Sequence, residues 1–476
     1  MRGKNEESTK SWDAEVDVVI AGAGATGLSA AIESADAGAE TIVLEKQATM
    51  FECSSALSGG AMSFAGSDFQ ERFGIKDSND SFYKDIMDVG QWKNDPKLVS
   101  AYVDNQLDTY NWLTRLGVRW GLIQQASGMS IPRAHKFDSV ELIRLLTETA
   151  RKKGVSILYR ASVSKLFTDE EKRVIGVEVE EVTGKARIKV RKGVVLATGG
   201  FSRDVERLKG SDPRFVTMVV TCTGKGNTGD GHRMAKTLGA YERDIEYVKP
   251  TFGMHAVGTS TSELSLLYYY GAIIVNKRGE RYVDESISYK DIGMATLDQL
   301  DGTGFQIFDQ KLFDEAVART EGCREAIPPE FVTSGLDKSR INLLVKGNTI
   351  EELAAEMNVP PEALRKTIDR YNNYVDSGKD LDFGRTTLTG GVGKIIRIER
   401  PPFYAYESRD FWTATYGGIV VDEDMHVLTP HGKIPGLYAA GEIIGGFHGT
   451  AYHNGTSMGK SVIFGRIAGR NVAKTR

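Results

Sequence analysis

The stretch Val18-Val-Ile-Ala-Gly22-Ala-Gly24-Ala-Thr-Gly27-Leu-Ser-Ala-Ala31 lies near the start of the chain and decides the fold that we expect. A β-branched run ends in a glycine turn, and an alanine-rich helical pattern follows as far as Gly38. A second β-branched run begins at Thr41. This order predicts a strand–helix–strand unit.

Each glycine of this turn has a separate expected task. Gly22 allows the tight turn, Gly24 lets the backbone approach a pyrophosphate, and Gly27 lets the helix pack closely on the strand. The free N–H groups at the helix N-terminus then face the anion. Glu45 ends the second run, about where an acid accepts a hydrogen bond from a ribose hydroxyl. The sequence therefore predicts a nucleotide site at this turn.

The composition excludes several classes of protein. The chain has 476 residues, of which 41% are hydrophobic, enough for two or three globular domains. A formal net charge of −4 gives no electrostatic reason to expect nucleic acid or an anionic membrane as partner. Three scattered cysteines are too few for a disulfide framework or a metal cage, which favours a reducing compartment.

The N-terminal residues are polar and unlike a signal peptide, and no run reaches the ~18 apolar residues of a membrane span. We therefore expect a cytoplasmic protein with a short disordered leader. No metal site is expected.

The remaining patterns predict an α/β fold with a parallel sheet. Residues 97–116 and 139–153 have helical periodicity, and residues 155–159 form an expected strand. A period of two around Thr183-Gly184 predicts an inserted β-hairpin. Asp230 is expected to cap the helix that follows it.

Beyond residue 244 the pattern changes to strands rich in tyrosine and isoleucine, with one helical stretch at 349–375 that Pro360-Pro361 interrupts. This change predicts a second, α+β domain inserted into the first. The expected divisions are a leader (1–15), the first part of the nucleotide domain (16–243), the inserted domain (244–412) and the second part of the nucleotide domain (413–476).

Four ordered motifs together resemble one family. They are Gly22 to Gly27 with Glu45, Ala197-Thr-Gly-Gly200, Thr228-Gly-Asp-Gly231, and Gly436-Leu-Tyr-Ala-Ala-Gly-Glu442 with the helix after it. The chain resembles the flavoproteins of the fumarate reductase and succinate dehydrogenase superfamily over residues ~16–476. The resemblance implies a Rossmann-like domain with extended FAD, a capping domain over the flavin ring, and hydride transfer between flavin N5 and a C–C single or double bond. Neither a motif nor a spacing requires a histidyl link, so we expect the FAD to be non-covalent.

Matching the family's motifs position by position gives the expected cofactor residues. They are Gly22, Gly24, Gly27, Glu45, Ser54, Gly59, Gly60, Val163, Gly199, Asp230, Glu442, Ser457 and Met458. With one nucleotide fingerprint and no haem or iron–sulfur motif, electrons are expected to pass to or from a separate partner, such as a quinone, an electron-transfer protein or a reduced flavin.

The residues by which fumarate reductases hold dicarboxylates differ in this chain. The position of the motif histidine is Lys249, that of a relay arginine is Tyr268, and that of the proton-donating arginine is Tyr289. The second carboxylate-binding arginine corresponds to Tyr452, and only His448 is retained. Without guanidinium groups a dicarboxylate loses its bidentate partner, so a dicarboxylate substrate is disfavoured.

Tyrosine hydroxyls suit a neutral carbonyl, because one phenol can hydrogen-bond the oxygen while another exchanges a proton at carbon. The Δ4-type 3-ketosteroid dehydrogenases, a second branch of the superfamily, use such a pair, and Tyr289 and Tyr452 match it. Asn454 stands where that branch has the serine that supports the proton path. We expect Tyr289 and Tyr452 to be catalytic, and His448, Tyr268, Asn454 and Lys249 to contact substrate.

Three functions stay open at this point. The first is a flavoenzyme that reduces or forms a C=C bond conjugated to a ketone in a bulky apolar substrate, such as a 3-ketosteroid. The second is a reductase of a small unsaturated acid, similar to fumarate or urocanate, held by Lys249 and His448. The third is a flavin-binding redox subunit without turnover.

Overall fold

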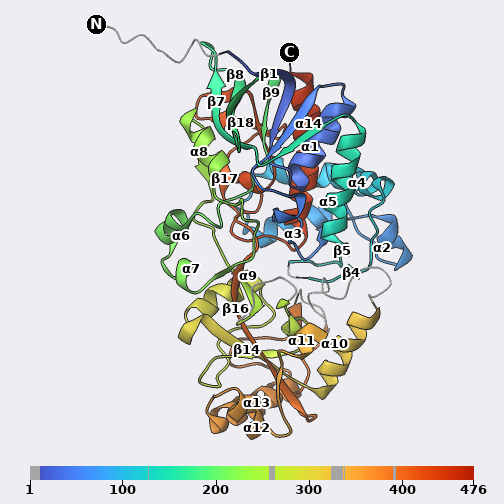
Figure 1. Cartoon of the computed structure of the whole chain (residues 1–476). Helices are drawn as coiled ribbons and strands as arrows, with labels where there is room; N and C mark the ends of the chain where they lie inside the picture. The colour runs from blue at the N-terminus through green and yellow to red at the C-terminus, as the bar shows by residue number, and fades with distance from the viewer. Residues whose placement is uncertain are drawn as a thin grey trace.

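The structure is a computed structural model that describes residues 11–126, 128–256, 263–322, 336, 338–389 and 393–475. Figure 1 shows two sheets along the long direction of the molecule, with β1, β9, α1 and α14 in the upper part and β14, β16, α12 and α13 in the lower part. β1, near the start of the described chain, and α14, near its end, both lie in the upper part.

The upper sheet has eight strands and a parallel core. Its central order is β18-β19-β9-β1-β2-β6, and the pairs β1–β2, β1–β9, β9–β19 and β2–β6 are parallel. The strands are β1 (Ala14–Ala21), β2 (Thr41–Glu45), β6 (Ser156–Tyr159), β7 (Ser162–Thr168), β8 (Val174–Glu181), β9 (Gly184–Leu196), β18 (His426–Thr429) and β19 (Gly432–Ala439). The α/β class with a parallel sheet is confirmed.

The expected hairpin is formed by β8 and β9, and β7 adds a third antiparallel strand to it. β9 is a single long strand that runs from this hairpin directly into the parallel core beside β1. The antiparallel extension and the nucleotide-binding core therefore share one continuous backbone.

Helices cover the upper sheet, and α1 packs against α14. A Cβ at Gly465 or Gly469 would lie 2.4 or 2.2 Å from a carbonyl oxygen of α1, so glycine is needed for this close approach. The helices of this part are α1 (Ala25–Asp36), α2 (Asp68–Arg72), α3 (Asn79–Val89), α4 (Pro96–Leu116), α5 (Ser139–Lys152), α6 (Val205–Ser211), α7 (Arg214–Thr217), α8 (Asp230–Thr237) and α14 (Thr456–Lys474).

The lower sheet is mainly antiparallel and is built around β16, which pairs with β10, β12, β14 and β15. Its strands are β10 (Val220–Thr221), β12 (Thr251–His255), β13 (Ile273–Val275), β14 (Thr303–Asp309), β15 (Val345–Gly347) and β16 (Phe403–Trp412). Its helices are α9 (Tyr289–Leu297), α10 (Gln310–Gly322), α11 (Lys338–Ile341), α12 (Ile350–Glu356) and α13 (Pro361–Ser377).

Two small sheets complete the described fold. The first contains β3 (Ala61–Ser63), β4 (Ile123–Gln124) and β5 (Ala134–Lys136), and the second contains β11 (Glu242–Arg243) and β17 (Gly418–Ile419). The division of the chain into domains at residues 243 and 412 stays a prediction.

Two local expectations were wrong. Gly229, with φ +74°, is the N-cap of α8, while Asp230 is its first helical residue and forms an ion pair with Lys46. The helical stretch at 349–375 is also not alone, because α9 and α10 precede it. α9 has only nine residues, and α10 begins directly after β14, so neither helix has a clear helical period in the sequence. In the described ranges, no helix combines the length and apolar character needed to cross a bilayer.

Candidate active site

Two adjoining cavities lie at the carboxyl ends of β1, β2 and β9, the edge at which ligands bind in open parallel sheets. The first, of about 780 Å³, we call the nucleotide cavity. The second, of about 1140 Å³, lies between the two large sheets, and we call it the inner cavity. Ser54, Ser55, Glu442 and Ser461 line both, so the two cavities join there.

The glycine turn shows why each glycine is needed. A Cβ on Gly22 would lie 2.4 Å from the Ala197 oxygen, and one on Gly27 would lie 1.8 Å from the Gly22 oxygen. A Cβ on Gly24 would meet only Ser55 Oγ, at 3.5 Å, an ordinary contact. Gly22 and Gly27 are thus required by the protein itself, whereas a side chain on Gly24 would extend into the nucleotide cavity.

The acid at the end of β2 is held by two backbone groups. The N–H groups of Ala23 and Gln47 each donate to the Glu45 carboxylate at 2.8 Å. Glu45 is buried and lines the nucleotide cavity. A carboxylate has further acceptor sites, so Glu45 can still accept hydrogen bonds from a ribose.

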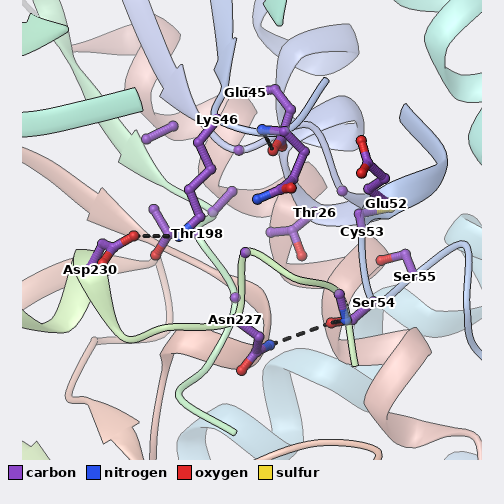
Figure 2. A pocket seen from close by; sticks show the side chains of 18 of the residues that line it. Thr26, Glu45, Lys46, Glu52, Cys53, Ser54, Ser55, Thr198, Asn227 and Asp230 are labelled. Carbon is purple, nitrogen blue, oxygen red and sulfur yellow. Dashed lines mark hydrogen bonds and ion pairs between the residues drawn. The ribbon is translucent and has the colours of Figure 1, made fainter. Parts of the chain in front are cut away.

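Figure 2 shows the polar side chains that face the nucleotide cavity from several elements. Lys46 and Asp230 form an ion pair across it. Burial raises the pKa of Asp230, but the hydrogen bond and charge of Lys46 outweigh it, so this pKa is below its usual value. Asn227 donates to Glu442 at 2.8 Å and to Ser54 at 3.4 Å.

Every predicted cofactor residue except Gly27 lines one of the two cavities. The free N-terminus of α1, the glycine turn, an acid for the ribose and a long continuous cavity together suit an extended dinucleotide. Three further residues that line the nucleotide cavity, Lys46, Asn227 and Ser461, were not predicted from the sequence. Lys46 follows Glu45 directly at the end of β2, and this position in the sequence could have indicated that it lies at the cofactor site.

The inner cavity brings together two tyrosines from distant parts of the chain. Tyr289 is the first residue of α9, and Tyr452 precedes α14. Their rings lie edge to face with centres 5.9 Å apart, and both line the inner cavity. Asn454 Nδ2 also donates to the Tyr289 hydroxyl at 3.4 Å.

Both phenols are held in the protonated form. Burial raises the pKa of Tyr289 well above its usual value and also raises the pKa of Tyr452. Each can therefore donate a proton or a hydrogen bond at neutral pH.

Three of the predicted substrate contacts do not line the inner cavity in the described part of the chain. Lys249 forms an ion pair with Asp291 at 2.6 Å. His448 is buried against the rings of Tyr416 and Tyr452, and burial lowers its pKa well below the usual value, so it is neutral.

Tyr268 is fully buried and packs edge to face on the ring of Tyr269, and it is Tyr269 that lines the cavity. The short helical turn at Leu267–Tyr269 sets which of the two faces inward.

Apolar groups form much of the remaining wall, among them Leu264, Leu266, Phe411 and Met458. Of the described residues that line the inner cavity, Lys136 is the one cation, and its Nζ donates to the Gly59 oxygen at 2.5 Å. No arginine is among those lining residues. The described residues of this cavity thus offer phenols, and no guanidinium, to a substrate.

The sequence analysis also missed Lys290, which follows Tyr289 on α9. In the sequence it is typical of a solvent-exposed helix charge, but it is fully buried behind the two tyrosines. Its Nζ contacts the hydroxyls of Thr251 and Thr413, which both line the inner cavity.

Comparison with known proteins identifies FAD-binding relatives in sequence and in structure. The family described as the FAD binding domain matches residues 17–458. The chain is 32% identical to the probable fumarate reductase Ifc3 of Shewanella frigidimarina over 96% of this chain and 74% of that protein.

Two solved structures are similar over nearly the whole chain. One is the open conformation of a flavocytochrome c3 fumarate reductase (30% identity, TM-score 0.77, 98% of this chain and 79% of that one). The other is the 3-ketosteroid-Δ4-(5α)-dehydrogenase of Rhodococcus jostii in complex with 4-androstene-3,17-dione (27% identity, TM-score 0.78, all of both chains).

We predict that Gly24→Val folds but loses its FAD, because the new side chain meets only Ser55 within the protein and fills the place of the pyrophosphate. Flavin absorbance per protein and the melting temperature of the apo-protein measure the two effects. Gly27→Val should instead fail to fold, because its Cβ would overlap the Gly22 oxygen. A Gly24→Val protein with normal flavin content would contradict this placement of the cofactor.

We also predict that the FAD is bound without a covalent link. No histidine is among the described residues that line either cavity. Precipitation with acid should release all flavin into the supernatant, as measured by absorbance. Yellow colour that stays in the washed pellet would show a covalent bond.

Proposed function

The chain belongs to the FAD binding domain family, with fumarate reductases among its relatives, and on this premise we propose that it acts on a C=C bond conjugated to a ketone. It binds FAD and is an oxidoreductase of the fumarate reductase family. The observation that carries the finer proposal is the pair Tyr289 and Tyr452, whose rings meet in a cavity whose described lining has no arginine.

The chemistry of the inner cavity favours a neutral carbonyl over a carboxylate. A carboxylate that leaves water needs a cation or several donors in place, and Lys136, the cation there, already donates to the Gly59 oxygen. A ketone needs one strong donor for its oxygen, and a protonated phenol supplies it. The apolar wall of Leu264, Leu266 and Phe411 suits a bulky hydrocarbon skeleton such as a 3-ketosteroid.

In this proposal bound FAD would supply or accept the hydride. The two tyrosines stabilise the negative charge on the ketone oxygen and transfer the proton at carbon. Tyr452 donates a hydrogen bond to the ketone oxygen and stabilises the enolate that forms there. Tyr289 gives its proton to the carbon next to the ketone during reduction, or removes it during desaturation. Asn454, through its bond to the Tyr289 oxygen, orients that phenol.

The electron partner is proposed to be a separate quinone, protein or reduced flavin, because the chain has one nucleotide fingerprint. The cytoplasmic location expected from the sequence belongs to the same proposal.

Reduction of a small unsaturated acid is the second candidate, favoured by the 32% identity to a probable fumarate reductase. It would require Lys249 and His448 to hold the acid. Neither lines the inner cavity, Lys249 is paired with Asp291, and the pKa of His448 is lowered by burial. These positions make the second candidate the weaker one.

We predict that the anaerobic protein, with reduced viologen as donor, reduces 3-keto-4-ene steroids and does not reduce fumarate or urocanate at a comparable rate. Viologen oxidation followed by absorbance measures each rate. Efficient fumarate reduction together with no activity on enones would replace the ketone proposal by the acid proposal.

We predict that Tyr289→Phe lowers kcat by ~10²–10⁴-fold with FAD and KM little changed, because a proton donor is lost. Tyr452→Phe should lower kcat by ~10²–10³-fold and also weaken ketone binding, because it removes the donor to the developing oxyanion. Steady-state rates and ligand titration separate the two effects. Parent rates in both variants would exclude the tyrosine mechanism.

A further inference from the structure

Lys290 is fully buried behind the tyrosine pair, and its ammonium group donates to three oxygens. Its Nζ donates to Thr251 Oγ1 at 2.5 Å, to Thr413 Oγ1 at 3.2 Å and to the Lys249 oxygen at 3.2 Å. An ammonium group has three N–H donors and no acceptor. The three acceptors around Lys290 therefore match a charged amine, in a place where burial of a charge is costly.

The surroundings of Lys290 are aromatic on the side of the inner cavity. Its Nζ lies 5.1 Å from the ring centre of Tyr452, 5.3 Å from that of Tyr416 and 5.7 Å from that of Tyr289. A cation at this distance interacts favourably with an aromatic ring, and it also stabilises a phenolate nearby.

The charged groups around Lys290 leave its proton easy to release. Burial lowers the pKa of Lys290 well below its usual value, Asp410 on β16 and Glu442 oppose this change, and Lys249 adds to it. Asp410 does not compensate the charge fully, since burial raises its own pKa well above the usual value. Neither Asp410 oxygen has a hydrogen-bond partner among the described residues.

A chain of hydroxyls connects Lys290 to the reacting phenols. Lys290 donates to Thr413 at 3.2 Å, a hydrogen bond with Thr413 partly opposes the rise that burial causes in the pKa of Tyr452, and the rings of Tyr452 and Tyr289 lie in edge-to-face contact. Thr413 lines the inner cavity, so this path reaches the substrate side without crossing bulk water.

We propose that Lys290 is the proton source of the tyrosine pair, acting through the hydroxyl of Thr413. The proposal rests on the proposed function and makes Lys290 a positioning residue, because it acts on the substrate through Tyr452 and Tyr289.

Only protons move along this path. Tyr289 first gives its proton to the substrate carbon, which turns the enolate back into a ketone. The Tyr452 proton, no longer needed by an enolate oxygen, then passes to the Tyr289 oxygen, the Thr413 proton passes to Tyr452, and a Lys290 ammonium proton passes to Thr413. Lys290 is left as a neutral amine and regains a proton from water when the product leaves. The hydride comes separately from the reduced flavin, so the substrate gains two hydrogens and the charges balance.

The test is the pH dependence of kcat for enone reduction by the FAD-loaded protein. Reduction needs the Lys290 ammonium, so the parent rate is full below the pKa of Lys290 and falls as the pH rises through it. Lys290→Met keeps the length of the side chain without a titrating group. We expect it to lower kcat by ~10²-fold with KM within about threefold, and to remove the fall at high pH.

Lys460→Met is the matched control. Lys460 is also a buried lysine, its Nζ donates to the Ile444 oxygen at 2.6 Å, and burial lowers its pKa to about 7. Lys460 is not part of the hydroxyl path, so its variant should keep the fall at high pH. If that fall disappears in Lys460→Met, or stays in Lys290→Met, the proposal is wrong.

A second variant distinguishes loss of the proton path from misfolding of Lys290→Met. Thr413→Val is close to threonine in shape, leaves Lys290 in place and breaks the hydroxyl path, so it should reproduce the loss of kcat and the changed pH profile. Melting temperature and flavin content verify that each variant is folded. Enone turnover at the parent rate in Thr413→Val would overturn the Lys290 proposal alone, whereas a parent protein inactive on every enone overturns the proposed function on which it rests.

Discussion

The close contact of the Gly27 backbone with the Gly22 carbonyl is the constraint on which the rest of this structure depends. It allows α1 to begin directly at the end of β1, so the first amide groups of the helix face the nucleotide cavity. The same turn lies against the end of β9, because a Cβ on Gly22 would touch the Ala197 oxygen. Three parallel strands thus end at one edge, and the cofactor site is the product of that edge.

A second consequence of the fold is that the two tyrosines to which we assign the proton chemistry come from both parts of the molecule. Tyr289 is carried by a helix that packs on β12 and β16 of the lower sheet, while Tyr452 belongs to the segment before α14 of the upper part. Neither part contains the pair alone. The inner cavity therefore depends on how the two sheets meet, and Lys290, Thr251 and Thr413 line the back of this junction.

Glycine turns and strand-end acids have local signatures, which is why the sequence predicted the parallel sheet and why the predicted cofactor residues other than Gly27 line the two cavities. The sequence was not sufficient where the environment comes from distant segments. In the sequence, Lys290 is typical of an exposed residue on a helix. It is buried because α9 packs against β12 and β16. In the same way, the phase of one short helical turn decides that Tyr269, and not Tyr268, faces the cavity.

The central claim is that a ketone-conjugated C=C bond is held between the flavin and the two tyrosines. A crystal structure of the FAD-loaded protein with a 3-keto-4-ene steroid tests this claim most directly. The account predicts the ketone oxygen within about 3 Å of Tyr452 Oη, and the adjacent carbon facing Tyr289 Oη. A steroid bound outside the inner cavity, or a ketone oxygen that contacts neither tyrosine, would contradict it.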